Sequence, residues 1–133
     1  MKRATLYTDG GARGNPGPAA IGFVLAGIGS TPVLYKEYIG KGTNNQAEYR
    51  ALLSGISRAK KEGVQDLRCF LDSELVVKQV RGEYRVKNED LKLLLVDIKK
   101  LLPDFRSITF EHVPRSKNAA ADKLVNEALD AQR

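Results

Sequence analysis

Apolar and β-branched residues gather in five short runs, and each run predicts a β-strand. The runs are Ala4–Asp9, Ala19–Ala26, Val33–Lys41, Leu67–Asp72 and Ile108–Val113. The first run ends at a pair of glycines, which is typical of a strand that stops at a turn. The second run is apolar almost throughout, and this pattern predicts a buried strand.

Four other segments carry apolar residues at a spacing of three to four, which predicts helices. These segments are Asn44–Glu62, Ser73–Arg81, Asn88–Leu102 and Asn118–Ala131. The first begins with a Thr-Asn-Asn capping signal and ends before Gly63, as helices commonly do. Pro103 ends the third, because proline cannot continue a helix.

The resulting order, β-β-β-α-β-α-α-β-α, predicts an α/β fold with a mixed sheet and helices on both faces. Three strands in succession form an antiparallel meander, whereas later strands separated by helices join in parallel. The chain has 133 residues with no internal repeat or linker, so we expect a single domain over residues 1–133.

The amino-acid composition excludes some classes of site and favours others. One cysteine, Cys69, and one histidine, His112, exclude an internal disulfide and a four-ligand structural zinc site. The excess of 22 Lys and Arg over 16 Asp and Glu suits a polyanionic partner, although solubility alone would also explain it. The apolar stretch Ala19–Gly29 falls short of the about 20 residues that a membrane span needs. We therefore expect a soluble, cytoplasmic protein that does not associate with membranes.

Four acidic residues lie where catalytic groups would be expected. Asp9 and Asp72 end the first and fourth strands, and the carboxyl ends of parallel strands meet at one edge of a sheet. Glu48 is placed in the first turn of one predicted helix, and Asp122 near the start of another. Taken singly, each has an ordinary explanation as a turn residue, a helix cap or a complement to a helix dipole.

Taken together, the four acids predict a metal site. Clustered carboxylates repel one another unless protons or cations neutralise them, and an all-oxygen cluster suits Mg²⁺ or Mn²⁺. Two such ions about 4 Å apart activate a water molecule and stabilise the leaving oxygen of a phosphodiester.

The glycine-rich segment from Asp9 to Pro18 is the second informative feature. It is either a loose turn or a place where the backbone approaches a sugar–phosphate chain closely, because glycine offers no side chain to obstruct it. It is not a nucleotide-binding loop, because the sequence contains no G-x-x-x-x-G-K-[ST] and no G-x-G-x-x-G after a strand.

Four motifs in this order resemble type 1 ribonuclease H over nearly the whole chain. They are D-G-G-A-R-G-N-P-G-P from Asp9, T-N-N-Q-A-E ending at Glu48, L-D-S at Leu71–Ser73, and N-x-x-A-D ending at Asp122. The resemblance implies a five-stranded mixed sheet of order 3-2-1-4-5. It also implies a monomeric, metal-dependent endonuclease that cuts the RNA strand of RNA–DNA hybrids to 3′-hydroxyl and 5′-phosphate ends.

The resemblance also assigns residues. The metal-binding and catalytic carboxylates fall on Asp9, Glu48, Asp72 and Asp122. Asp9 and Asp72 are the central ligands, and Glu48 also lies near the 2′-hydroxyl of the RNA strand. The expected hybrid contacts in the minor groove, where 2′-hydroxyls mark RNA, are Gly10, Gly11, Asn15, Asn44 and Asn45. The expected pocket for a phosphate of the DNA strand is formed by Lys41, Thr43 and Asn88, although Thr43 has the simpler explanation of a helix cap.

The chain departs from better-known family members in three places. The segment from Arg81 to Asn88 leaves no room for the basic protrusion that many members use to grip DNA. A short basic stretch, Lys78, Arg81, Arg85 and Lys87, either replaces it in part or is simply a solvated face. Glu74 stands where glutamine is common, which changes one expected hybrid contact.

The third departure concerns the loop after the last strand, where the family often has a mobile histidine that helps products leave. Here His112 comes one position too early, on the predicted strand, and we expect it to be structural. Arg115 is the candidate replacement for the family's histidine in that loop.

Two other functions remain open from the sequence. One is a related nuclease that acts on DNA junctions, or the nuclease domain of a polymerase, but the T-N-N and glycine motifs argue against a DNA-only enzyme. The other is an inactive nucleic-acid-binding domain. A binder would gain from losing negative charge near phosphates, so the four intact acids argue against it.

Overall fold

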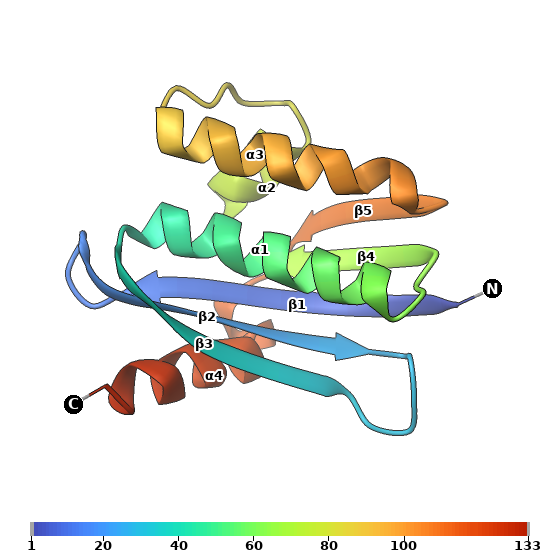
Figure 1. Cartoon of the computed structure of the whole chain (residues 1–133), viewed down its shortest axis with the longest axis horizontal. Coiled ribbons are helices and arrows are strands. Elements are labelled where there is room, and N and C mark those ends of the chain that lie inside the picture. The colour runs from blue at the N-terminus through green and yellow to red at the C-terminus, as the bar shows by residue number, and fades with distance from the viewer. Residues whose placement is uncertain (1, 133) are drawn as a thin grey trace.

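The computed structural model describes residues 2–132, which fold into a five-stranded mixed sheet of order β3-β2-β1-β4-β5 (Figure 1). The strands are β1 (Arg3–Ala12), β2 (Gly17–Ala26), β3 (Val33–Gly42), β4 (Asp66–Leu71) and β5 (Ser107–His112). The helices are α1 (Asn44–Lys61), α2 (Glu74–Val80), α3 (Glu89–Leu101) and α4 (Ala119–Asp130). Short 3₁₀ turns lie at Leu102–Asp104 and Arg115–Lys117.

The strand pairings confirm the expected topology. β1 pairs with β2, and β2 with β3, in antiparallel fashion, which makes the predicted meander. β4 pairs in parallel with both β1 and β5. The mixed sheet and its order are therefore those that the element pattern and the family resemblance predicted.

Helices cover both faces of the sheet, as Figure 1 shows, with α1, α2 and α3 on one side and α4 on the other. The main core lies under the first three helices and includes the fully buried Leu6, Phe23, Leu52 and Ile98. Burying each such side chain contributes about 1.5–3 kcal/mol. A smaller cluster, centred on Val125, lies under α4. No helix within residues 2–132 has the length and apolar character to cross a bilayer.

Two glycines allow helices to approach the sheet closely from opposite sides. A Cβ at Gly10 would collide with the backbone of Ala47 in α1. A Cβ at Gly22 would lie 2.8 Å from the Cβ of Leu124 in α4. Since Gly22 pairs with Asp9 and Gly10 follows Asp9, both close contacts lie beside Asp9.

The main difference from the sequence-based expectation is the end of β1. The strand was expected to stop at Asp9, but it continues through Gly10 and Gly11 to Ala12, paired with residues 19–21 of β2. Only residues 13–16 form the connecting turn. A Gly-Gly pair is read locally as a turn signal, but here the glycine at position 10 serves the close contact with α1.

Candidate active site

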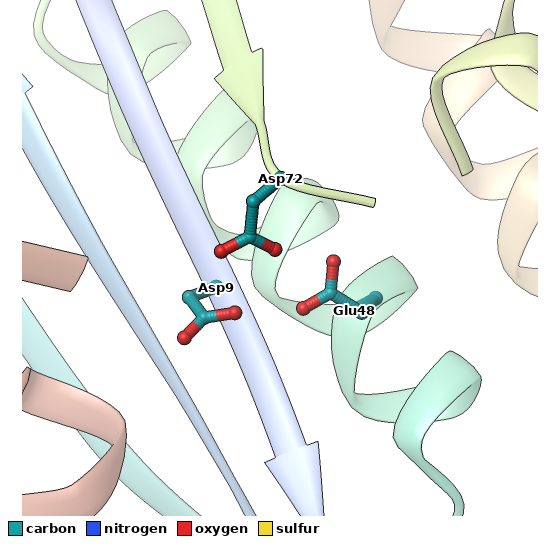
Figure 2. A group of neighbouring side chains, drawn as sticks. All are labelled: Asp9, Glu48 and Asp72. Atoms are coloured by element: carbon teal, nitrogen blue, oxygen red, sulfur yellow. The ribbon is translucent and has the colours of Figure 1, made fainter. Parts of the chain in front are cut away.

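The two aspartates meet where the ladder between the central parallel strands ends. The last parallel pair of β1 and β4 is Thr8 opposite Leu71, and Asp9 and Asp72 are the next residues of the two chains. Asp9 is thus not at the end of its strand, as the sequence suggested, but at the end of the parallel ladder. Figure 2 shows the two aspartates side by side, with the carboxylate of Glu48 directed toward them from α1.

Three of the four predicted acids form one compact group. A carboxylate oxygen from each of Asp9, Glu48 and Asp72 lies within 4.8 Å of the others. Asp9 and Glu48 are each only 6% exposed. Like charges at this separation and burial are costly, so the group requires protons or cations.

Glu48 is held in place by β1. The backbone N–H of Gly10 donates a 2.7 Å hydrogen bond to its Oε1, while its buried Oε2 has no hydrogen-bond partner among the described residues. The first turn of α1 contains no acidic residue, so the expectation that Glu48 lies there is wrong. Its side chain therefore does not complement the helix dipole, an effect confined to the first turn.

The alternative explanation of Asp72 as a helix cap is also excluded. Ser73 caps α2, because its hydroxyl accepts a 3.3 Å hydrogen bond from the N–H of Val76. The carboxylate of Asp72 instead accepts a 3.2 Å hydrogen bond from the side-chain amide of Asn118.

Burial and crowding raise the pKa of two of these acids. The pKa of Asp9 rises from 3.8 to about 7, mainly because burial disfavours its charged form. A hydrogen bond with Glu48 opposes this rise, and the nearby charges of Asp72 and Asp122 add to it. Burial, followed by the charge of Asp9, holds the pKa of Glu48 well above its usual range. Without cations, the pair therefore keeps a proton near neutral pH.

The chemistry of this donor set fits a hard divalent cation. All the available atoms are carboxylate oxygens, which Mg²⁺ and Mn²⁺ prefer. The unpartnered Oε2 of Glu48 has free lone pairs for an ion. A bound cation would also favour the ionised carboxylates and so reverse the rise in pKa.

Asp122 lies in the first turn of α4, as expected, at the side of this group. It is near enough to contribute to the raised pKa of Asp9, but it is not one of the three clustered acids. Its Oδ1 lies 3.8 Å from the guanidinium of Arg115, whose side chain is 83% exposed. Asp122, the fourth predicted ligand, is therefore positioned at the rim of the group, beside the exposed guanidinium of Arg115.

The acids open into a cleft of about 420 Å³. Predicted residues that line it, besides the four acids, are Gly10, Gly11, Asn44, Asn45 and Arg115. Asn15 is not part of that lining, but its Oδ1 accepts a 3.0 Å hydrogen bond from the N–H of Asn44. Asn44 in turn accepts a 2.8 Å hydrogen bond from Ala12 at its Oδ1. Both asparagines use their oxygens to fix the β1–β2 turn to α1, so a ligand would meet their amide nitrogens.

Comparison with known proteins agrees with this geometry. A family model described as "Reverse transcriptase-like" matches residues 7–128. The ribonuclease HI of Halobacterium salinarum is 44% identical over 96% of this chain. The crystal structure of ribonuclease H1 from that organism covers 97% of this chain and 98% of its own, with a TM-score of 0.92. The chain belongs to the ribonuclease H family.

Two further relatives match almost the whole chain. A bifunctional protein of Mycobacterium tuberculosis is 44% identical over 97% of this chain. A structure described as LC11-RNase H1 in complex with RNA/DNA hybrid is 41% identical, with a TM-score of 0.90, and covers 97% of this chain and 98% of its own. The chain spans 36% of the length of the mycobacterial protein and 65% of that of the Halobacterium protein.

The expected phosphate pocket of the ribonuclease H family lies apart from the cleft. Thr43 is the N-cap of α1 and forms a capping box with Gln46. Asn88 is the N-cap of α3 and accepts a 3.1 Å hydrogen bond from Leu91. Lys41 is exposed and lines a separate cavity of about 330 Å³. A capping role thus accounts for Thr43 and Asn88 structurally, and their contact with a DNA phosphate stays a prediction.

The cavity beside Lys41 also contains Arg50, a cation that the sequence analysis did not select. Arg50 is exposed on α1 and has no motif around it, so only its position in space connects it with Lys41. Asp90 faces the same cavity and its Oδ2 accepts a 3.3 Å hydrogen bond from Gln46.

The surroundings of His112 and of the short basic stretch bear on two other predictions. His112 ends β5, on the strand as expected, with its side chain 41% exposed and its Nδ1 4.0 Å from Glu74, and its structural role stays a prediction. In the short basic stretch, Lys78 pairs with Glu74 at 3.4 Å and Arg81 with Glu83 at 3.5 Å. Acidic neighbours thus partly neutralise the proposed replacement for the basic protrusion.

A larger groove, about 630 Å³, lies at the other end of the sheet. Its one acid, Asp66, is already engaged by Arg106 through two hydrogen bonds of 3.0 and 2.7 Å. The hydroxyl of Ser107 donates a third, at 2.9 Å. These bonds lower the pKa of Asp66, which makes it a satisfied structural group and leaves the carboxylate cleft as the candidate active site.

Proposed function

We propose that this protein is a ribonuclease H that hydrolyses the RNA strand of RNA–DNA hybrids, leaving 3′-hydroxyl and 5′-phosphate ends. The observation that carries the proposal is the buried group of Asp9, Glu48 and Asp72 at the floor of a cleft edged by Gly11 and Asn44. The hybrid bound to LC11-RNase H1 supports this choice of substrate.

Asp9, Glu48 and Asp72, with Asp122 at the rim, would hold Mg²⁺, for which Mn²⁺ is a substitute. Two ions bound there would neutralise the phosphodiester and supply an activated water in the two-metal mode. The carboxylates provide the negative charge and fix the positions of the ions, because each extends from a different element of the fold.

The edge of the cleft would select RNA. Gly11 presents backbone without a side chain, so a nucleic-acid strand can approach β1 closely there, and Gly10 lines the same cleft. The amide nitrogens of Asn15, Asn44 and Asn45 would donate hydrogen bonds in the minor groove, where the 2′-hydroxyls of RNA lie. The carboxylate of Glu48 would accept a hydrogen bond from a 2′-hydroxyl of the RNA strand.

Three further residues would grip the other strand. Lys41, at the cavity that also contains Arg50, would pair with a phosphate of the DNA strand, and Thr43 and Asn88 would donate hydrogen bonds to it. Arg115 would attract the scissile phosphate, because a guanidinium stays charged at every working pH.

A cleavage assay tests this function directly. Labelled RNA–DNA hybrid, RNA duplex and DNA duplex are each incubated with the protein, with and without Mg²⁺. We expect cleavage of the hybrid only with the metal, and a loss of at least ~10³-fold in Asp9→Asn. A hybrid with four consecutive ribonucleotides should be cut, whereas full 2′-O-methylation should block cutting. Cleavage of the DNA duplex would favour the DNA nuclease, and metal-dependent binding without cleavage would favour the inactive binding domain.

We also propose that the protein acts as a monomer in the cytoplasm. This expectation comes from the resemblance to type 1 ribonuclease H. Light scattering coupled to gel filtration should give the mass of one chain, 14.6 kDa. A stable dimer in that measurement would contradict the monomer.

A further inference from the structure

The buried side chain of Asn118 links three elements that carry the acids. Asn118 precedes α4 and is only 1% exposed. Its Nδ2 donates one hydrogen bond of 2.8 Å to the carbonyl of Thr8 and another of 3.2 Å to Oδ2 of Asp72. Its own carbonyl accepts a 3.1 Å hydrogen bond from the N–H of Asp122. One residue therefore contacts the backbone beside Asp9, the side chain of Asp72 and the backbone of Asp122.

These contacts differ from those of an ordinary helix cap. Asparagine at this position usually accepts a hydrogen bond from the first turn through its side-chain oxygen. In α4 no such capping bond is present, and Oδ1 of Asn118 has no partner among the described residues. The side chain instead acts through its two amide N–H groups, which only a donor such as asparagine can provide.

The location of these bonds explains why they matter. The parallel ladder of β1 and β4 ends at Thr8 and Leu71, so no strand pairing fixes the spacing between Asp9 and Asp72 beyond that point. The amide of Asn118 bridges the two strands at that position, from Thr8 on β1 to Asp72 after β4. Partners that orient a ligating carboxylate in this way commonly alter metal affinity or activity by 10–100-fold when removed.

We propose that Asn118 is a positioning residue that fixes the separation of Asp9 and Asp72 and the orientation of the Asp72 carboxylate for cation binding. The inference rests on the proposed function, because it assigns Asn118 to the same site. It makes Asn118 part of the machinery without contact to substrate or to the reacting atoms.

The test compares Asn118→Ala and Asn118→Asp with the wild type. Asn118→Ala removes both amide N–H donors. Asn118→Asp keeps the side-chain volume and a residue type that caps helices well, but its carboxylate cannot donate a hydrogen bond. The matched control is Gln65→Glu, which makes the same change from amide to carboxylate at an exposed residue before β4, at the other end of the sheet. Three readouts are needed: Mg²⁺ affinity by calorimetry without substrate, kcat and KM on the hybrid, and unfolding in EDTA.

We expect Asn118→Ala to weaken Mg²⁺ binding and to lower kcat by about 10- to 100-fold, with KM for the hybrid within about threefold of wild type. Asn118→Asp should lose at least as much kcat, because it removes both donors and adds a carboxylate beside Asp72. Gln65→Glu should match the wild type in all three readouts. If Asn118→Ala does not fold, full kcat in Asn118→Asp still overturns the inference.

The inference is overturned if a folded Asn118→Ala protein keeps wild-type Mg²⁺ affinity and kcat, or if Asn118→Asp retains full kcat. Failure of the proposed function looks different. In that case the wild type itself does not cut the hybrid, while the calorimetric difference between wild type and Asn118→Ala still reports on the positioning of the carboxylates.

Discussion

Replacing Asp9 by asparagine should stabilise the metal-free protein. The raised pKa of Asp9, about 7 against 3.8 for a free carboxyl group, measures how strongly the folded state disfavours its charge. A shift of about 3 units at about 1.4 kcal/mol each sets an upper limit of ~4 kcal/mol at pH 8. Glu48 shares the proton and the buried amide of asparagine has its own desolvation cost, so we expect about 1–3 kcal/mol.

The sign of this effect depends on pH in a defined way. Between about pH 4 and pH 7 the Asp9 carboxyl binds a proton in the folded state but not in the unfolded state. The stability of the wild type therefore falls as the pH rises through this window, and Asp9→Asn does not share that loss. The difference between the two proteins should be near zero at pH 4, grow up to pH 7 and stay constant above it.

The assay is denaturant unfolding in EDTA at pH 4, 6 and 8, repeated at pH 8 with Mg²⁺. The matched control is Asp97→Asn on the exposed side of α3, where the carboxylate lies 3.9 Å from Lys100 and is 54% exposed. That control should change stability by no more than about 0.5 kcal/mol at any pH. Mg²⁺ should stabilise the wild type and have little effect on Asp9→Asn, because a ligand that binds only the folded state adds stability.

The prediction fails, and is refuted, if Asp9→Asn is less stable than the wild type at pH 8 in EDTA. It is also refuted if the gain is the same at pH 4 as at pH 8, since the effect would then come from packing rather than from charge. Equal stabilisation of both proteins by Mg²⁺ would remove Asp9 from the set of metal ligands.

Three further predictions concern residues around the cleft. Gly10→Ala should destabilise the fold by more than 1 kcal/mol in denaturant unfolding, because the new Cβ meets the backbone of Ala47. Gly11→Ala should fold normally, because the nearest neighbour of its Cβ lies at 3.8 Å, and it should lose activity only through weaker hybrid binding. Arg115→Ala should lower kcat more than it raises KM, and a change in KM alone would place Arg115 in binding only. A double variant with alanine at Arg85 and Lys87 should raise KM. It should also reduce the slope of log affinity against log salt concentration by roughly 0.7 to 0.9 for each phosphate contact that is lost. An unchanged slope would mean that the basic stretch is only a solvated face.

Most of the framework could be predicted from local sequence, because apolar periodicity and capping signals act within a few residues. The five strands and four helices were all expected, and most of their ends agree within one residue. The exceptions are the start of β2, which lies at Gly17 rather than Ala19, and the end of β1, where Gly10 and Gly11 were read as a turn. The need for glycine at position 10 comes from the backbone of Ala47 in α1, and no local pattern reports a contact between elements so distant in sequence.

The candidate site could be predicted in part, because part of it follows from the order of the strands and helices. That Asp9 and Asp72 meet follows from the parallel pairing of their strands, which the element order already implied. The place of Glu48 came from the family resemblance, because the approach of α1 to β1 decides which helical residues reach the acids. Asn118 was read only as the start of a helix, although the N-x-x-A-D motif contains it. Its two donated bonds reach Thr8 and Asp72, which are 110 and 46 residues away in the chain.

The register of the central strands connects these observations. Because the parallel ladder ends one residue before each aspartate, the two carboxylates are adjacent but their spacing is not set by strand hydrogen bonds. Burial between α1 and α4 raises the cost of the negative charge on Asp9, and the same helices carry Glu48 and Asp122. A cation offsets that cost, and the raised pKa of Asp9 and the metal affinity of the site therefore have a common origin. Changes that lower the crowding, such as Asp9→Asn, should accordingly gain stability and lose metal binding together.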